Sequence, residues 1–196
     1  MTPGAEPLSP NSLRDAFSSF ATGVAVVSAN TPMGPIGNTV SSFNTVSMEP
    51  PLVLFSLKRA TRSFEAWQTA DAFAVNVLTS EQADLSRRFA QQRLDKWEGV
   101  ATRAGHYVCA PIIEGSLAVF ECMVWARYDG GDHLIIVGQV QGWDRRPGRA
   151  GPLLFFGSDY HAIASLKPEK GSGSTKVSAL KRELSDDQLQ RQLDAP

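Results

Sequence analysis

The pattern of hydrophobic and polar positions along this chain consists largely of short β-type runs separated by turn residues, which predicts a mainly β structure. The runs at 117–128 and 133–143 are joined by Asp129-Gly130-Gly131-Asp132, which is typical of a hairpin turn. Strands are expected at residues 24–28, 38–47, 52–57, 72–78, 117–128, 133–143 and 153–156, of which 38–47 is rich in hydroxyl groups.

Three segments show helical spacing instead. Ser9-Pro10 is typical of a helix start, and apolar residues then recur at helical intervals up to an expected end at Gly23. Thr61 is the expected cap of a helix at 62–69, and Ser80 that of a helix running to about Phe89. Residues 30–37 are rich in Pro and Gly, which predicts a turn, and 90–111 are expected to be mostly irregular.

The order of these elements favours one fold class. Strands do not alternate regularly with helices, so a doubly wound parallel sheet is not expected. A closed antiparallel barrel with peripheral helices fits better, because closure removes exposed strand edges. With 196 residues and 42% apolar content, one domain with a full core is expected.

The chain is expected to divide into a flexible leader at 1–10, a barrel domain at 11–165, and a linker with a polar helical tail at 166–196. In the tail, Ser185 and Gln188 match a capping box, and four leucines give a thin apolar stripe along 177–193. Such a stripe is too thin to fold alone, so it either frays or docks on a partner subunit.

Charge and motifs exclude several function classes. A formal net charge of −1 does not favour nucleic-acid binding, and no apolar run approaches the 18 residues of a membrane span. The start of the chain lacks the pattern of a signal peptide, and Cys109 and Cys122 fit no metal or redox spacing, so a cytoplasmic location is expected. The three histidines are too widely spaced for a metal site. The GxGxxG, P-loop and GxSxG motifs are absent.

The stretch from Gly37 to Ser63 carries the main candidate chemistry. The loop from Lys58 to Ser63 offers cations and hydroxyls at a predicted helix start, which is typical of a phosphate site. A neighbouring strand, 39–45, is rich in hydroxyl and amide side chains that can hydrogen-bond a polar heterocycle. Each part has a plainer alternative, a solvated turn for the loop and an ordinary half-exposed strand for the hydroxyls.

Two further candidates are weaker by themselves. His133 follows Gly131-Asp132 at a strand start, where it is either an acid–base residue or an ordinary surface histidine. Tyr160 and His161 lie just beyond the strand that holds Phe155 and Phe156, where a ring could cover a ligand.

The chain resembles the short-chain flavin reductases, the reductase components of two-component flavin monooxygenases. The matching segments run in the same order from Leu13 to Ile163 and leave the tail uncovered. They are LRDAFSSFATGVAVVS, GNTVSSFNTVSMEPPLVLFSL, FAVNVL, GDHLIIVGQV and PLLFFGSDYHAI.

The resemblance implies a split β-barrel of the antiparallel, Greek-key, FMN-binding type, built as a homodimer with flavin near the subunit interface. It implies oxidation of NADH or NADPH and reduction of FMN or FAD, with His133 at the nicotinamide side. Residues implied at the ring are Thr39, Val40, Ser41, Ser42, Phe43, Thr45, Val46, Phe89 and Tyr160. Residues implied at the phosphate are Ser56, Leu57, Lys58, Arg59, Ala60, Thr61 and Arg62.

The mechanism implied is direct hydride transfer, after which reduced flavin diffuses to an oxygenase. Ser41-Ser42 replaces the Asn-Ala or Ala-Ser of many relatives, and the basic loop favours FMN over FAD. Alternatives are an electron carrier that retains FMN, a flavoenzyme reducing corrinoid cobalt or ferric iron, and a flavin oxidase or oxygenase. Arginines that could select NADPH by its 2′-phosphate are Arg127, Arg145, Arg146 and Arg149.

Overall fold

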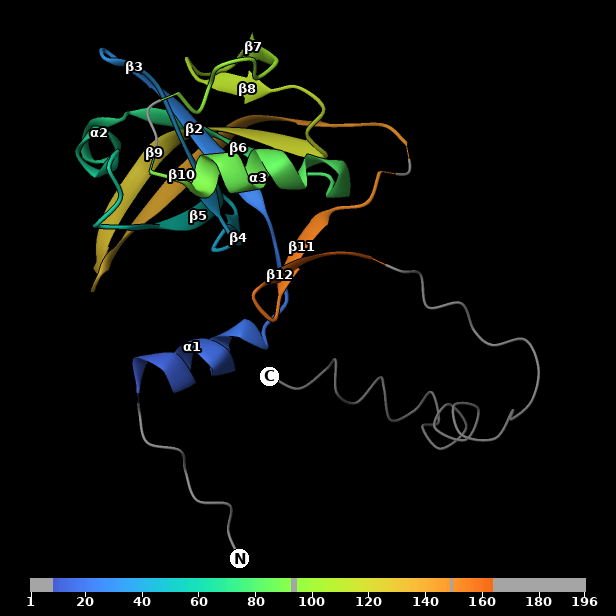
Figure 1. Cartoon of the computed structure of the whole chain (residues 1–196). Coiled ribbons are helices and arrows are strands. Elements are labelled where there is room, and N and C mark those ends of the chain that lie inside the picture. The colour runs from blue at the N-terminus through green and yellow to red at the C-terminus, as the bar shows by residue number, and fades with distance from the viewer. Residues whose placement is uncertain (1–8, 93–94, 149, 164–196) are drawn as a thin grey trace, which may run out of the picture. The chain divides into compact units, whose positions relative to one another are not determined.

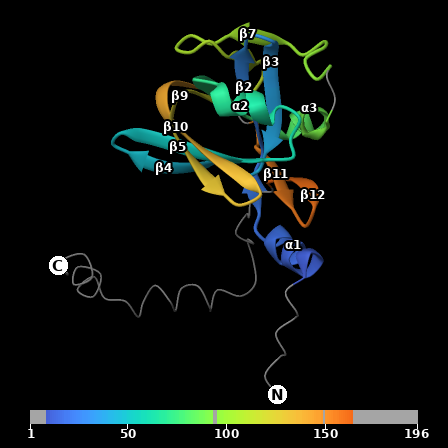
Figure 2. The ribbon, with the colours of Figure 1, turned by 90° about the vertical axis from the view of Figure 1, so that its left-hand side faces the viewer.

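A seven-stranded antiparallel sheet forms the body of the protein, in the order β3-β2-β6-β9-β10-β5-β4 (Figure 1, Figure 2). The computed structural model describes residues 9–92, 95–148 and 150–163, so Arg149 and the predicted tail helix lie outside the described residues. The strands of this sheet are β2 (Ala25–Thr31), β3 (Gly34–Val40), β4 (Asn44–Met48), β5 (Pro51–Lys58), β6 (Ala72–Val77), β9 (Ala118–Gly130) and β10 (His133–Arg145).

Two small sheets and short helices surround this body. The helices are α1 (Pro10–Ser18), α2 (Phe64–Thr69), the 3-10 turn η1 (Ser80–Gln82) and α3 (Ala83–Ala90). One small sheet contains β1 (Thr22–Gly23), β11 (Leu153–Phe156) and β12 (Asp159–Ala162), and the other pairs β7 (Thr102–Ala104) with β8 (Pro111–Ile113). The mainly antiparallel β class with peripheral helices is therefore confirmed.

The sheet is not closed by a continuous backbone ladder, because β3 and β4 stand at its two ends. A side chain links the two ends instead. The Ser42 hydroxyl, just after β3, donates to the Ser56 carbonyl on β5 (3.1 Å) and accepts from the Ser56 N–H (2.9 Å). The barrel predicted from sequence is thus split, and a serine side chain replaces one ladder connection.

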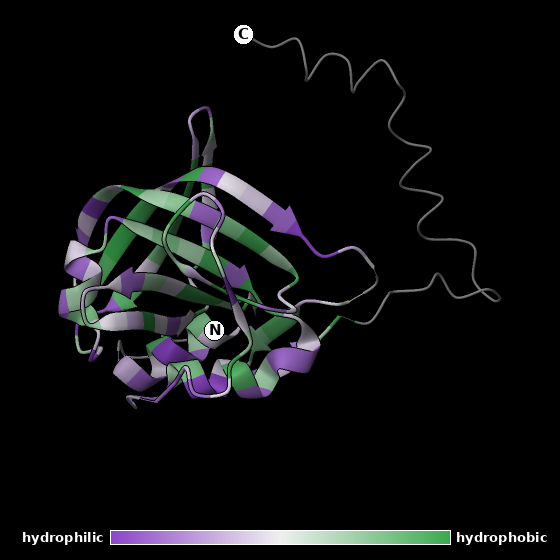
Figure 3. Ribbon diagram, turned by 90° about the horizontal axis from the view of Figure 1, so that it is seen from above, coloured by the Kyte–Doolittle hydropathy of each residue, from purple (hydrophilic) through white to green (hydrophobic). Residues whose placement is uncertain are grey.

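The main core fills the concave side of the sheet, and hydrophobic residues concentrate along the strands (Figure 3). Phe55 packs edge-on against both Trp67 of α2 and Phe73 of β6, and all three are at most 1% exposed. A second cluster packs α3 through Phe89 against Val26 and Leu153. These two clusters hold the ends of β3, β5 and α3 in fixed positions.

Several predicted boundaries are wrong at the N-terminal end. The cap at Ser9 is confirmed, with a capping box to Ser12, but α1 ends at Ser18, and Gly23 belongs to β1. Residues 30–37 are not one turn, because β2 runs to Thr31 and β3 begins at Gly34. Pro35 is tolerated there because β3 is an edge strand, which need not donate every N–H to a ladder.

Other boundaries shift for local reasons. The predicted strand 38–47 breaks at 41–43, where the Ser42 hydroxyl takes over the pairing with β5. The N-cap of α2 is Ser63 rather than Thr61, and the box that caps η1 is formed by Thr79 rather than Ser80. The segment 90–111 contains the short strand β7. The strand β12 was missed because Gly157 and Ser158, both with positive φ, form an unpredicted hairpin turn.

Candidate functional site

A cavity of about 330 Å³ lies where the ends of β3, β5 and α3 meet the start of β10. We call it the central cavity. It brings the hydroxyl strand, the basic loop and the histidine of the sequence prediction to one place. Its lining consists of Asn38, Thr39, Val40, Ser41, Ser42, Ser56, Leu57, Lys58, Thr61, Phe89, Ala90, Gln91, Gln92 and His133.

Most polar side chains on the β3 wall are already bound within the protein. The Thr39 hydroxyl donates to the Ser86 carbonyl of α3 (2.7 Å), and the Ser42 hydroxyl is taken by Ser56. The Asn38 Oδ1 atom accepts from the Ser63 hydroxyl (2.7 Å) and from the indole N–H of Trp67 (2.8 Å). These bonds fix the shape of the wall, so its side chains cannot all turn toward a ligand.

The basic loop also differs from the row of free amides expected at a helix start. The backbone N–H of Arg59 donates to Asp132, that of Thr61 to Lys58, and that of Arg62 to the Gln92 side chain. The helix that follows has only six residues, and the side chain of its N-cap residue, Ser63, bonds to Asn38 and caps no N–H group of the helix. Of the residues of this loop, Lys58 and Thr61 line the central cavity, and phosphate binding by the loop stays a prediction.

Arg59 is a structural clamp rather than an open cation. Its Nε–H donates to the Gly131 carbonyl (2.9 Å), its Nη2 lies 3.3 Å from the Asp129 carboxylate, and its guanidinium stacks over Phe64 (5.6 Å). These contacts tie the basic loop to the β9–β10 turn. His133, at the end of that turn, is the ladder partner of Lys58 across the strands. Arg59 thereby sets where His133 lies relative to the loop.

The turn is rich in charge. The Nδ1 atom of His133 lies 2.7 Å from an Asp132 carboxylate oxygen, which lowers the pKa of Asp132. The Gly131 N–H bond and the Arg59 cation lower the pKa of Asp129. Both carboxyls are therefore anionic at neutral pH. Asp132 is thus the partner that orients the His133 ring at the cavity.

Not every predicted site residue lines the central cavity. Tyr160 bonds through its hydroxyl to Ser86 (2.7 Å), and Arg87 stacks on its ring, so it holds the β11–β12 hairpin to α3. Arg62 lines a neighbouring cavity. For these residues a flavin contact stays a prediction. The predicted residues outside the central lining are Phe43, Thr45, Val46, Arg59, Ala60, Arg62 and Tyr160.

Sequence reasoning missed some of the lining. Asn38, Ala90, Gln91 and Gln92 line the cavity without having been singled out. The two glutamines come two and three residues after the predicted helix end at Phe89, and paired amides at a helix end were the available signal. Of the arginines considered for a 2′-phosphate, Arg127 donates to carbonyls of Trp67 and Ala70, and Arg146 donates to that of Gly115.

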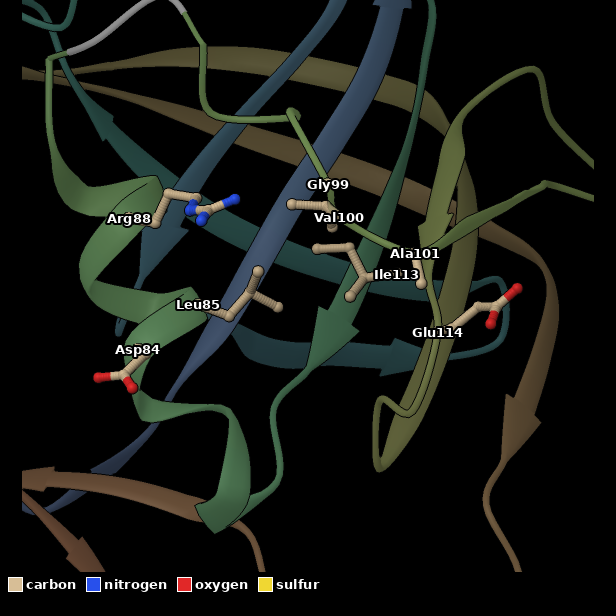
Figure 4. A pocket seen from close by; sticks show the side chains of 8 residues that line it. All are labelled: Asp84, Leu85, Arg88, Gly99, Val100, Ala101, Ile113 and Glu114. Atoms are coloured by element: carbon tan, nitrogen blue, oxygen red, sulfur yellow. The ribbon is translucent and has the colours of Figure 1, made fainter.

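A separate cavity of about 260 Å³ lies beside α3, between Leu85, Arg88 and the 99–101 segment (Figure 4). The ionisable side chains that line it either have partners within the protein or point away from the cavity. Arg88 donates to the Glu98 carbonyl (2.7 Å), Asp84 pairs with Arg87, and the Glu114 carboxylate points away from the hollow (Figure 4). We therefore centre the functional site on the central cavity.

Across 9–92, 95–148 and 150–163 no cluster of three or more His, Cys, Asp or Glu side chains is arranged to hold a metal ion. Within the same residues no helix has the length and apolar character needed to cross a membrane.

The sequence of this chain is similar to those of known proteins. The flavin reductase like domain family matches residues 17–164. The reductase subunit HsaB of a flavin-dependent monooxygenase from Mycobacterium tuberculosis is 39% identical over 164 residues, or 83% of this chain and 86% of that protein. The protein named FMN reductase (NADH) SmoA, from Agrobacterium fabrum, is 42% identical over 81% of this chain and 87% of its own.

Solved structures also resemble the fold of this chain. The NADH:FAD oxidoreductase SgcE6 of Streptomyces globisporus C-1027, in complex with NAD and FAD fragments, superposes with a TM-score of 0.77. It is 34% identical, and the alignment covers 84% of this chain and 100% of that one. The similarity spans the whole described barrel, including every element that lines the central cavity.

Proposed function

Since this chain belongs to the flavin reductase like domain family, we propose that it is an NAD(P)H:flavin oxidoreductase that supplies reduced flavin to a partner monooxygenase. One observation carries the proposal. The family match covers the barrel, and within it a single cavity contains both a phosphate-type cation, Lys58, and the histidine of the predicted nicotinamide side, His133. The two cofactors supply the hydride-transfer chemistry when bound.

The protein's own contribution is binding and alignment. Lys58 and Thr61 meet the phosphate of the flavin through charge-assisted bonds, and Gln91 and Gln92 offer amides at the facing wall. The wall formed by Thr39, Val40 and Ser42 is held by the hydrogen bonds of Thr39 and Ser42 within the protein, so it orients the flavin ring without reorganising. Asp132 orients the His133 ring, and His133 positions the nicotinamide of NADH or NADPH beside the flavin.

A direct test uses the purified full-length chain, NADH, and free FMN or FAD. We expect NADH oxidation to require added flavin and to saturate with it. After anaerobic reduction, ultrafiltration should recover reduced flavin in the filtrate, as expected for a product that leaves for an oxygenase. Flavin that stays with the protein, with turnover independent of added flavin, would instead identify an electron carrier or a reductase of another acceptor.

We propose that the functional unit is a homodimer. The helix α1 buries none of its residues on its own subunit, and Phe17 of α1 is 68% exposed. Phe20, two residues after the helix end, is 77% exposed. Trp125 of β9 is also more than half exposed. Exposed apolar surface of this kind supports a second copy as its cover. Sedimentation should give a dimer that Phe17→Glu weakens, and a monomeric wild type would refute the assignment.

We propose a cytoplasmic location, supported by the two free cysteines and by the use of reduced pyridine nucleotide. Neither nucleic acid nor a membrane is assigned as a partner. Cell fractionation with an antibody against the chain tests this, with recovery in the cytosolic fraction as the expected result.

A further inference from the structure

Two segments that line the central cavity are held together at its edge by the chain that follows α3. Residues 38–42, at the end of β3, form the β3 wall, and residues 89–92, at the end of α3, form what we call the α3 wall. The Thr39 hydroxyl joins the two elements by its bond to the Ser86 carbonyl, in the middle of α3. The spacing of the two walls therefore also depends on what holds the end of α3.

Lys96 bridges the end of α3 and β3. Its ammonium donates to the Phe89 carbonyl in the last turn of α3 (2.9 Å) and to the Gly37 carbonyl of β3 (3.2 Å). The last four carbonyls of a helix have no partner within the helix, and a cation beside them is favourable because the dipole of the helix is negative there. β3 is an edge strand, so one side of its backbone faces no strand of the sheet. One half-buried side chain thus connects the two elements.

Trp97, the next residue, packs against the same two elements. Its ring lies edge-on to the Phe89 ring, with 4.7 Å between the centroids. It also lies against Gly37, where an added Cβ atom would come within 2.8 Å of the Trp97 ring. Phe89 is fully buried and lines the central cavity. Lys96 and Trp97 therefore fix the backbone and the ring of a residue that belongs to the cavity.

We infer that Lys96 is a positioning residue for the flavin site, because it holds the α3 wall against β3 and so sets the spacing of the two walls. Lys96 lines the neighbouring cavity that also contains Arg62, and it is not among the residues that line the central cavity. The inference rests on the proposed function, which assigns the central cavity to the flavin. Walls that are held before binding spare the ligand the cost of ordering them. Loss of the bridge therefore weakens flavin binding and leaves the chemistry of bound flavin unchanged.

The test compares wild type with Lys96→Met, which keeps a long side chain and loses the ammonium. The dissociation constants of riboflavin, FMN and FAD are measured by fluorescence titration. We expect Lys96→Met to raise the Kd of all three flavins by a similar factor, about tenfold, while kcat at saturating flavin changes less than twofold.

Riboflavin has no phosphate, so it separates positioning of the walls from direct binding of a phosphate. Weakening confined to FMN and FAD, or to FAD alone, would overturn the inference, because Lys96 would then contact the ligand itself. An unchanged Kd for all three flavins would also overturn it.

Arg88→Met is the matched control. Arg88 is a half-buried cation that also joins α3 to the following chain, by donating to the Glu98 carbonyl (2.7 Å), but this bond does not involve β3. We expect both variants to lower the melting temperature by a similar few degrees and Arg88→Met to change the Kd of each flavin less than twofold. Equal weakening of flavin binding by the two variants would overturn the inference, since general loosening of α3 would then explain it.

A conservative variant completes the test. Lys96→Arg should restore the flavin Kd to within about threefold of wild type, because a guanidinium can also donate to two carbonyls. A Lys96→Arg variant as weak as Lys96→Met would overturn the inference. If Lys96→Met does not fold, Lys96→Gln takes its place with the same expectation. A wild type that binds no flavin would refute the proposed function itself, whereas flavin binding that is insensitive to Lys96 would refute only this inference.

Discussion

The two sides of the central cavity are built differently. On the β3 wall, Asn38, Thr39 and Ser42 are committed to bonds with α2, α3 and β5, and Asn38 is 7% exposed. On the opposite side, the β9–β10 turn with His133 is exposed and held to the basic loop through contacts of Arg59. The wall is therefore held by hydrogen bonds to three other elements, whereas the turn is held to the basic loop through the contacts of one arginine. Changes to the wall should cost stability, and changes to the turn should cost alignment.

The largest effect is expected at Gly37 of β3, the residue directly before Asn38. A Cβ atom there would lie 2.6 Å from the Phe89 ring and 2.8 Å from that of Trp97. Because Phe89 is fully buried, Gly37→Ala should lower the free energy of unfolding by about 3 kcal/mol in urea titration. The control Gly23→Ala meets no atom within 4 Å and should change it by about 0.5 kcal/mol or less. Equal effects at the two positions would contradict a tightly packed wall.

A smaller loss of stability is expected from Asn38→Ala. The change leaves the buried indole N–H of Trp67 without its acceptor, which should cost about 2 kcal/mol in thermal or urea unfolding. The control Asn44→Ala removes an exposed amide whose only described bond is to the next residue. If the Asn38 variant were as stable as the control, the wall would not depend on this bond.

A change in the β9–β10 turn should lower activity with NADH more than it lowers stability. Arg59→Gln breaks an exposed clamp, so the free energy of unfolding should fall by less than about 1 kcal/mol. The displaced His133 should lower kcat/KM for NADH about tenfold, while the Kd for flavin changes less than twofold. Arg145→Gln is the matched arginine control for steady-state kinetics and titration. A loss of flavin binding in Arg59→Gln would show that Arg59 holds the phosphate directly.

The smallest effect is the pH response of the turn. Hydrogen bonds and cations lower the pKa values of Asp129 and Asp132 below the ordinary 3.8. Their contribution to the turn is therefore complete above that pH and is lost as the pH falls through the lowered values. The Gly131 amide signal in NMR should titrate with a midpoint below 3.8, and Asp129→Asn should abolish that step. A midpoint above 3.8 would show that the clamp is absent in solution.

The buried carboxylate of Glu121 on β9 is held by hydrogen bonds from another segment of the chain, as the side chains of the β3 wall are. Burial acts to raise the pKa of Glu121, but hydrogen bonds from the N–H groups of Tyr107, Val108 and His106, with Arg103 nearby, lower it on balance. Burial raises the pKa of Cys122 to about 12, so this thiol stays protonated at neutral pH. Both residues lie on β9, and both are less than 5% exposed.

Much of the fold followed from local pattern. Short apolar runs placed the strands at 72–77 and 133–143 to within a few residues, because runs of this length between turn residues are typical of buried strands. Pattern failed at 30–37, where Pro and Gly predicted a turn, since tolerance of proline depends on whether a strand lies at an edge. That position in the sheet follows from pairing with distant strands.

The candidate site, like the fold, follows partly from the local sequence and partly from tertiary contacts. The sequence by itself determined which residue types gather near 38–63, and therefore that a phosphorylated cofactor is the expected ligand. The resemblance to the flavin reductases identified that cofactor as a flavin and added His133 at the nicotinamide side. Only the tertiary structure decided which of these groups are available. Thr39, Ser42 and Arg59 have partners 14 to 72 residues away, and these partners satisfy atoms that the local sequence presents as free. Hydrogen bonds between distant segments form only on folding, so sequence spacing alone could not reveal them.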